Sequence, residues 1–251
     1  MSTGVEFSVT ELSDYARYSR SGQQDKVDEL VDRNLDIQGI RIYDLEPDFS
    51  GMDYDHALSI LVHDAVVDLY DRNQELDEKE IFDFMASRMG ERVQRSDGLN
   101  EEVLWGRVYD NKLNEVVDDI AHYYADNFVE GRDVRTEEVV GNRGFFGRAD
   151  ILREIDGETE LRDIKTHYSD VQVTMPYQEF KMGCYALISR GDLEVERFII
   201  EYPLQQKKLE VDPTEWFGEV VEVAEEYRGL LEDASGLDGT DLDAISIADF
   251  M

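Results

Sequence analysis

Cysteine is almost absent from this sequence, since Cys184 is its only occurrence among 251 residues. One cysteine excludes an internal disulfide, and it also excludes any metal site built from several thiolates. Long apolar runs are missing too: no stretch reaches the 18 residues expected of a membrane-spanning helix, and no signal-peptide pattern is present. These absences predict a soluble, cytoplasmic protein that does not contact a membrane.

Lysine is scarce as well, with 7 residues against 18 arginines, while aspartate and glutamate together number 59. The formal charge of -34 destabilises a compact chain by self-repulsion at low salt. In about 1 M salt the Debye length falls to about 3 Å, so distant carboxylates hardly repel one another. The composition therefore resembles that of haloarchaeal proteins, which fold in a salt-accumulating cytoplasm.

The same charge is compatible with another class of protein, an acidic partner of basic proteins or a mimic of nucleic acid. Acidic residues are spread along the whole chain, however, and hydrophobic residues make up 41% of it. We therefore expect a folded domain and keep the acidic binding protein as an alternative.

The hydrophobic pattern divides the chain into a helical part and a sheet part. Apolar residues at helical spacing predict helices over 9–20 and 52–72, followed by further acidic helices. Later apolar residues fall in short runs bounded by glycines, as in strands, with a helix after Pro176. The pattern predicts one α/β domain over 1–235, with a central mixed sheet flanked by helices. Its parts are a helical portion over about 7–130, a sheet core over about 135–210, a terminal helix over 213–233 and a flexible tail over 236–251.

An Asp156-Gly157 pair lies between two apolar runs, and Asp-Gly favours a two-residue type I′ turn. Such a turn pairs residues that are equally distant from it, which places Asp150 opposite Asp163. Directly opposed residues of an antiparallel pair share a face, with Cα atoms about 4.5 to 5.5 Å apart. Lys165, two positions further along the strand, lies on the same face.

Like charges opposed across a ladder are destabilising unless something compensates for them. A divalent cation would do so, because carboxylates are the hard oxygen ligands that Mg²⁺ prefers and the ion leaves room for phosphate oxygens. The Lys165 ammonium could then act on an attacking water or stabilise charge on the phosphate. The alternative is a solvated hairpin face, on which two aspartates meet by chance in an acid-rich chain.

The residues around this turn resemble two motifs of a known nuclease family. The residues GRAD at 147–150 are similar to its G-x-x-D strand, and DIK at 163–165 is similar to its (D/E)-x-K strand. Upstream, the segment SILVHDAVVDLY resembles the helix that supplies the family's histidine, here His63. In this order, over about residues 7–225, the chain resembles the PD-(D/E)xK nucleases, specifically the RecB-like and CRISPR-associated exonucleases.

A second histidine, His56, lies seven residues before His63 on the same predicted helix. Seven residues span about 10.5 Å along a helix axis, so only one of them can bind a given ion through an imidazole bond of about 2.0 to 2.1 Å. His63 has the better match to the family's helix and is the one implied as a ligand.

The resemblance implies a restriction-endonuclease-like core and a role for each site residue. His63, Asp150, Asp163 and the main-chain carbonyl of Ile164 would hold Mg²⁺ or Mn²⁺, and Lys165 would act with the two aspartates in catalysis. The implied activity is hydrolysis of DNA at single strands or ends, as an exonuclease in repair, recombination or replication. The residues do not distinguish exonuclease from endonuclease action. A structure-specific resolvase on the same core and a non-enzymatic acidic binding protein remain the alternatives.

Two departures from the family's pattern concern its cysteines and one of its helices. Many relatives bind an iron-sulfur cluster, but Tyr18 stands where the first cysteine would fall, so no cluster is expected. The family's helical Gln and Tyr, which approach DNA and the active site, would correspond to Gln178 and Tyr185. They are usually four residues apart, whereas here they are seven apart and Lys181 occupies the four-apart place. Either Gln178 or Lys181 can therefore take the helix role.

Basic residues are not scattered evenly, because several, such as Arg148, fall within the segment that resembles the catalytic core. They suggest a locally positive lining for DNA, although Arg153 and Arg162 are expected to offset nearby acids instead. Tyr168 and Tyr177 are candidates for stacking on bases, and a role in the core is equally compatible with them.

The end of the chain, AISIADFM, resembles the peptide that binds sliding clamps, with Ile247 and Phe250 in its apolar positions. The usual glutamine is replaced by Ala244 and the second aromatic residue by Met251. A frayed tail is the alternative that the composition favours.

Overall fold

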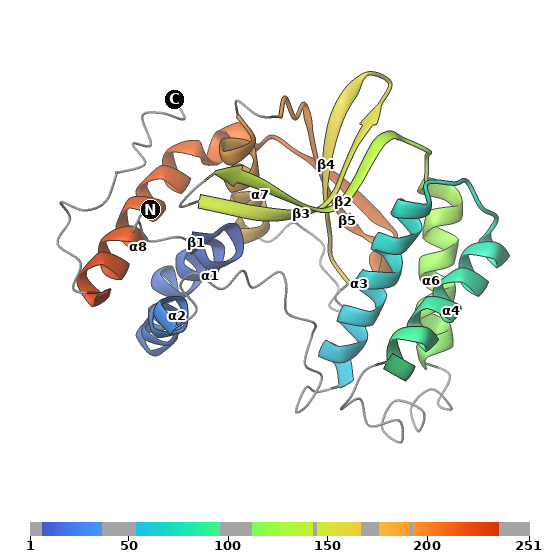
Figure 1. The fold of residues 1–251 in the computed structure, drawn as a ribbon, viewed down its shortest axis with the longest axis horizontal. Helices are drawn as coiled ribbons and strands as arrows, with labels where there is room; N and C mark the ends of the chain where they lie inside the picture. Colours follow the sequence, from blue (N-terminus) through green and yellow to red (C-terminus); the bar gives the residue numbers. More distant parts are fainter. Residues whose placement is uncertain are drawn as a thin grey trace.

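The computed structural model describes residues 7–36, 54–95, 112–142, 145–166, 176–190 and 193–235. These residues form seven α-helices and six β-strands (Figure 1). The helices are α1 (Val9–Arg20), α2 (Gln24–Asp36), α3 (Tyr54–Arg72), α4 (Glu78–Arg95), α6 (Lys112–Asn127), α7 (Pro176–Ser189) and α8 (Phe217–Ser235). The strands are β1 (Phe7–Ser8), β2 (Arg132–Asn142), β3 (Phe145–Ile155), β4 (Glu158–Ile164), β5 (Arg197–Tyr202) and β6 (Lys207–Val211).

The six strands form one mixed sheet in the order β1-β3-β4-β5-β6, and β2 pairs with the other edge of β3. The pairs β2–β3, β3–β4 and β5–β6 are antiparallel, whereas β1–β3 and β4–β5 are parallel. The predicted α/β fold, with a central mixed sheet flanked by helices, is confirmed. This arrangement is consistent with a restriction-endonuclease-like core and is not specific to it.

β3 pairs with three of the other five strands, which are β1, β2 and β4. β1 pairs with its start, at Phe145 and Phe146, and β4 pairs with its end, from Ile151 to Ile155. Because β2 runs along the opposite edge, β1 and β4 share one edge of β3. Residues 147–150 lie between them on that shared edge, where β3 has no strand beside it among the described residues.

The β3–β4 hairpin follows the register that the sequence predicts. Asp156 and Gly157 have φ angles of 54° and 90°, and positive φ at both central residues is the signature of a type I′ turn. The ladder runs without a register shift as far as Ile151 and Arg162, which are equally distant from the turn.

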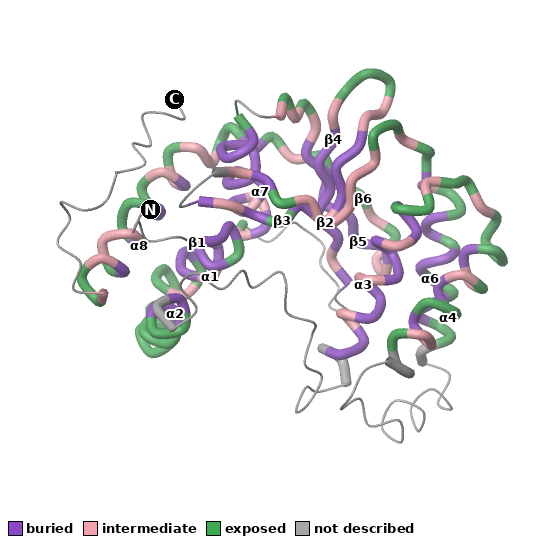
Figure 2. Tube along the Cα trace, viewed as in Figure 1, coloured by how far each residue is buried: buried purple, intermediate pink, exposed green. Residues whose placement is uncertain are grey.

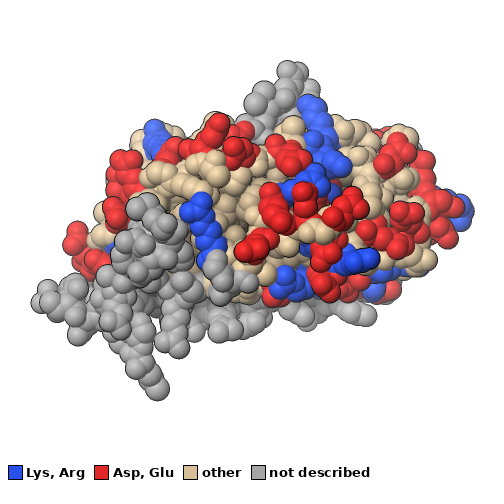
Figure 3. All heavy atoms as spheres, turned by 90° about the horizontal axis from the view of Figure 1, so that it is seen from above, with Lys and Arg blue, Asp and Glu red and all other residues tan. Residues whose placement is uncertain are grey.

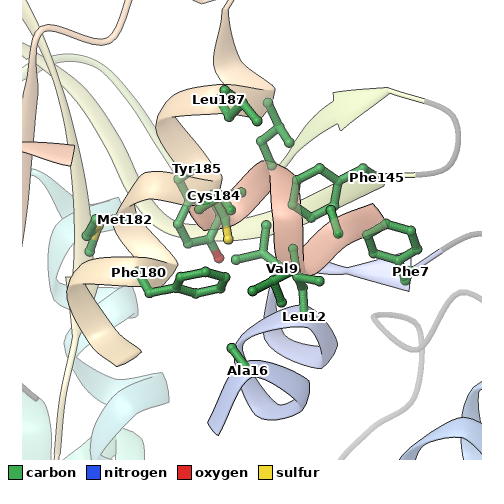
Figure 4. Close-up of a cluster of buried hydrophobic side chains, with 14 of the residues drawn as sticks. Phe7, Val9, Leu12, Ala16, Phe145, Phe180, Met182, Cys184, Tyr185 and Leu187 are labelled. Atoms are coloured by element: carbon green, nitrogen blue, oxygen red, sulfur yellow. The ribbon is translucent and has the colours of Figure 1, made fainter. Parts of the chain in front are cut away.

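Each face of the sheet carries its own hydrophobic core. On one face, α1, α2, α7 and α8 bury side chains such as Phe7, Leu12 and Phe180, which Figure 4 shows packed together. On the other face, α3, α4 and α6 bury side chains such as Leu61 and Ile151. Figure 1 shows the two helical groups on opposite sides of the sheet, and Figure 2 shows buried positions concentrated along the strands and the inner helix faces.

The first helical layer is tied together by a capping interaction. The Ser8 side chain accepts a hydrogen bond of 3.1 Å from the Glu11 N–H, and the Glu11 carboxylate accepts one of 2.7 Å from the Ser8 N–H. This reciprocal pair satisfies two main-chain donors at the start of α1. The Glu11 carboxylate also accepts a hydrogen bond from Asn34, which links α1 to α2.

Four charged side chains form a closed cluster under α3 and α6, which we call the ion-pair core. Its members are Arg153, Glu160, Arg162 and Glu201, and their side chains are 0–4% exposed. Both arginines donate to Glu160, and Arg162 also pairs with Glu201. The hydroxyls of Tyr70 and Tyr124 complete the cluster by donating to Glu201 at 2.9 and 3.0 Å. The prediction that Arg153 and Arg162 offset nearby acids is confirmed.

The surface reflects the acidic composition. Figure 3 shows one face on which aspartate and glutamate side chains are numerous and basic side chains are few. Among the helices described, none combines the length and apolar character that crossing a membrane requires.

Candidate metal centre

A cavity of about 390 Å³ opens where α3, β3, β4 and α7 meet. The residues that line it include five that the sequence predicts for the site: His63, Asp150, Asp163, Ile164 and Lys165. A larger cavity of about 720 Å³, beside the end of α7 and strands β5 and β6, contains none of them. Both helical layers and the sheet therefore contribute to the smaller cavity, and these five predicted site residues lie there.

Asp150 is held by the main chain of the neighbouring strand. Its Oδ2 accepts a hydrogen bond of 2.7 Å from the Ile164 N–H. Counted from the turn, the regular pairing of β3 with β4 stops at Ile151 and Arg162. At Asp150, the next residue, the side-chain carboxylate takes the place of a main-chain acceptor. In the same gap beside β3, the Tyr185 hydroxyl donates a hydrogen bond of 2.5 Å to the Arg148 carbonyl.

His63 reaches this point from α3. Its Nε2 lies 3.3 Å from Asp150 Oδ2, and its Nδ1 lies 3.9 Å from Asp64 and 4.0 Å from Glu137. Burial lowers the pKa of His63, but Asp150, with Asp64 and Glu137, more than offsets this and raises it to about 10. Burial also opposes the charge on Asp150, whose pKa His63 nevertheless holds below its ordinary value. The imidazole is thus protonated at neutral pH, and a cation would have to displace that proton.

Asp163 lies between two lysines. Its Oδ1 accepts a hydrogen bond of 2.8 Å from Lys181 Nζ, and its Oδ2 forms an ion pair with Lys165. That ion pair is close but lacks hydrogen-bond geometry, so Oδ2 is a buried oxygen without a hydrogen bond. Burial lowers the pKa of Lys165, with Lys181 adding to this effect and Asp163 opposing it. For Lys181, burial is outweighed by Asp163, which raises its pKa well above the ordinary value.

Glu137 is a charged residue of this region that was not predicted from the sequence. The constant register of β2 against β3 places it opposite Asp150, on the edge of β3 away from β4. Its φ of 53° lies in the left-handed region, which a glutamate rarely adopts. One carboxylate oxygen approaches His63, and the other forms an ion pair with Arg148. Burial raises the pKa of Glu137, while Arg148 and His63 act in the opposite direction.

A sequence signal for Glu137 does exist. The paired ends of β2 and β3 are Asn142 and Phe145, so only two residues join the strands, and the second of them is Gly144. If positions 143 and 144 are taken as a two-residue turn, residues that are equally distant from them pair, as around Asp156-Gly157. Glu137 then lies opposite Asp150.

Of the two candidates for the helix role, Lys181 lines the cavity and Gln178 does not. Gln178 is fully buried on α7, accepts a hydrogen bond from the Tyr202 hydroxyl and is absent from the cavity lining. Tyr185 is buried as well, with its hydroxyl on the Arg148 carbonyl. Lys181, which lies between them on the same helix, reaches Asp163 and lines the cavity.

The residues present fit a hard divalent cation. Within the part of the chain that the structure describes, His63, Glu137 and Asp150 offer ligand atoms that all lie within 4.8 Å of one another. Further carboxylate oxygens lie nearby on Glu137 and Asp163, each in an ion pair, with Arg148 and Lys165 respectively. Carboxylate oxygens beside one imidazole suit Mg²⁺ or Mn²⁺. Asp163 is not part of this group of three, so its predicted sharing of an ion with Asp150 stays a prediction, as does the Ile164 carbonyl.

Other predicted residues lie outside this region or outside the described residues. Ile247, Phe250 and Tyr168 fall outside the described residues, and the side chain of His56 is not described either. Tyr177 is the second residue of α7, and the Arg17 guanidinium lies 5.5 Å from the centre of its ring.

Comparison with known proteins adds little to this geometry. No protein-family model matches the sequence, and no curated protein matches it. One solved structure, described as "Crystal structure of SSO0001", is similar over 57% of this chain and 81% of its own, with 17% identity and a TM-score of 0.28. Because that score is below 0.5, the similarity carries no argument about fold or function.

Proposed function

We propose that the protein is a metal-dependent DNA nuclease of the PD-(D/E)xK type, of RecB-like character, that hydrolyses phosphodiester bonds at single strands or ends. One observation carries this proposal: His63 from α3, Asp150 from β3, and Asp163 and Lys165 from the end of β4 line a single cavity. The carboxylates and the imidazole suit a divalent ion, and the ammonium suits a phosphate.

Each of these residues has a role that follows from its surroundings. When bound, Mg²⁺ or Mn²⁺ would act as a Lewis acid on the scissile phosphate. His63 and Asp150 would hold the ion, with Asp163 and the Ile164 carbonyl as further predicted ligands. Lys165 is the candidate catalytic residue, because it lines the cavity beside Asp163 and its ammonium can stabilise negative charge on a phosphate. The water oxygen would attack phosphorus and lose its proton to solvent, the Lys165 ammonium would stabilise the charge that develops on the phosphate, and the leaving sugar oxygen would take a proton from solvent.

DNA must bind next to this cavity despite the charge of the chain. Three cationic side chains, Arg148, Lys165 and Lys181, line the cavity and place positive charge where a phosphate would lie. In concentrated salt little free energy comes from counterion release, so direct contacts of this kind carry more of the affinity. A locally positive cavity in an acidic protein is therefore compatible with a DNA substrate.

The variant Lys165→Ala tests the proposal. With Mn²⁺ in concentrated KCl, we expect the wild type to cut 5′- or 3′-labelled single-stranded DNA and the variant to cut it on the order of 10² to 10³ times more slowly. The matched control is Lys79→Ala, because Lys79 is an exposed lysine on α4, distant from the cavity lining. Circular dichroism should show that both variants keep the fold. A fully active Lys165→Ala protein would overturn the mechanism.

The acidic binding protein is the second candidate, and the net charge of -34 favours it. Such a protein would leave every labelled DNA intact and would bind basic proteins whether or not Mn²⁺ is present. Adding a four-way DNA junction to the same assay also detects the resolvase, which would cut the junction and spare linear strands.

A further inference from the structure

Glu137 offers the site a ligand that the predicted set does not include. It joins His63 and Asp150 in the group of potential ligands within 4.8 Å, whereas Asp163 does not belong to that group. Strands β2 and β4 both flank β3, which carries Asp150. The second carboxylate that approaches His63 belongs to Glu137 on β2.

The two carboxylates differ in what already neutralises them. Asp163 is 1% exposed and is held by both Lys165 and Lys181. Glu137 is paired with Arg148, whose side chain is 41% exposed. Ion pairs with exposed partners contribute little to stability, so Glu137 gives up Arg148 at a small cost. Asp163, which is itself buried, would have to leave two mostly buried ammonium groups, 14% and 16% exposed, which costs more.

The oxygens of Glu137 are also placed for an ion. Oε2 forms the ion pair with Arg148, whereas Oε1 lies 4.0 Å from His63 Nδ1, too far for a hydrogen bond. Oε1 is therefore the Glu137 oxygen that faces His63, and the potential ligand atoms of Glu137, His63 and Asp150 all lie within 4.8 Å of one another. Asp163 lines the cavity and its Oδ2 is paired with Lys165, whereas Glu137 is not among the residues that line the cavity and approaches His63 from beside it.

We propose that Glu137 is a direct ligand of the divalent ion and completes a three-residue set with His63 and Asp150. This inference rests on the proposed function only in that both use the same ion. Glu137 would fix the position of the ion on the β2 side of Asp150, and Asp163 would serve mainly to hold Lys165 and Lys181 in place.

Calorimetric titration of the full chain with Mn²⁺ tests this assignment without any nuclease assay. We expect Glu137→Gln to raise the dissociation constant at least about tenfold relative to the wild type. The matched control is Glu138→Gln, because Glu138 is the next residue of β2 and pairs with Arg135 instead. It should leave the dissociation constant unchanged. Glu137→Asn is the second variant, since asparagine tolerates the left-handed backbone and also lacks the carboxylate.

The absorption spectrum of bound Co²⁺ separates a ligand from a residue that only orients His63. If Glu137 is a ligand, its loss changes the visible bands, because another donor replaces the carboxylate. Unchanged bands in Glu137→Gln, or an unchanged Mn²⁺ affinity, would overturn the inference.

The nuclease assay keeps the two proposals apart. A wild type that cuts DNA, together with a Glu137→Gln variant of unchanged Mn²⁺ affinity, would sink the inference and leave the proposed function standing. Glu137-dependent Mn²⁺ binding in a protein that cuts no DNA would support the inference and sink the proposed function. A wild type that binds no Mn²⁺ overturns both.

Discussion

Two groups of buried charge lie on the same sheet, and they use different cations. The ion-pair core pairs its carboxylates with the buried Arg153 and Arg162, and Glu160 also contacts the partly exposed Arg197. The candidate metal centre uses His63, Lys165 and Lys181 and opens onto a cavity. Arginine does not lose its proton in proteins, whereas histidine and buried lysine exchange theirs readily.

This difference separates a structural role from a chemical one. A permanent guanidinium that loses its carboxylate stays charged and buried, so breaking the ion-pair core lowers the stability of the fold. An imidazole or an ammonium group can give up its charge when a ligand arrives, so the metal centre can change partners. Removing a carboxylate should therefore destabilise the first group and disable the second.

The largest effect on stability is expected from Glu201→Gln in the ion-pair core. The change leaves Arg162 with one carboxylate partner instead of two and weakens the hydrogen bonds from Tyr70 and Tyr124. Breaking a buried pair typically costs about 3 to 5 kcal/mol of the free energy of unfolding. Urea denaturation at fixed KCl concentration measures it.

Asp150→Asn is the matched variant at the metal centre. Its histidine partner can release a proton when the carboxylate is removed, so the loss of stability should be clearly smaller than for Glu201→Gln. Equal losses from the two variants would break the contrast between the two groups.

A smaller effect on the free energy of unfolding is expected when the pH is lowered and Glu160 becomes protonated. Burial raises the pKa of Glu160, but Arg162 and then Arg153 more than offset this, so its pKa in the folded protein lies below 4.5. A carboxyl with a depressed pKa stabilises the fold above its unfolded value, and this contribution disappears as the pH falls through the folded value. The difference in unfolding free energy between the wild type and Glu160→Gln should therefore shrink below about pH 4.5. A difference that stays constant to low pH would contradict the assignment.

The smallest effects are expected on α7. This helix places Gln178 in a buried hydrogen bond and Lys181 at the cavity. Gln178→Ala removes a buried hydrogen bond with Tyr202 and should cost about 1 kcal/mol of stability while the cleavage rate per folded molecule stays the same. Lys181→Ala removes one of the two lysine partners of Asp163 and should slow cleavage per folded molecule by about tenfold, which Gln178→Ala should not do. The reverse pattern would return the helix role to Gln178.

The parts of the fold that depend on local signals were predictable from the sequence. The Asp156-Gly157 turn fixes the β3–β4 register by itself, and the apolar spacing of 52–72 marks α3. The same turn predicts that Asp150 and Asp163 lie at equal distances from it on neighbouring strands, and in the structure both line one cavity.

The remaining features depend on contacts between distant segments. The pairing of Arg162 with Glu201 requires β4 to lie parallel to β5, which no turn specifies. The reach of Lys181 to Asp163 depends on how α7 packs on the sheet. The regular ladder ends at Ile151, and the Asp150 side chain then replaces a main-chain acceptor. A prediction that assumes a regular hairpin does not include this change.

The division of the molecule into two cores has a consequence for how activity would fail on heating. His63 belongs to the helical layer on one face of the sheet, and Lys181 belongs to the layer on the other. Cooperative units of a protein can open separately, each with its own free energy. A centre assembled from both layers would stop working when the less stable layer opens, even while the other keeps its structure, so the temperature of inactivation would report the weaker half of the molecule.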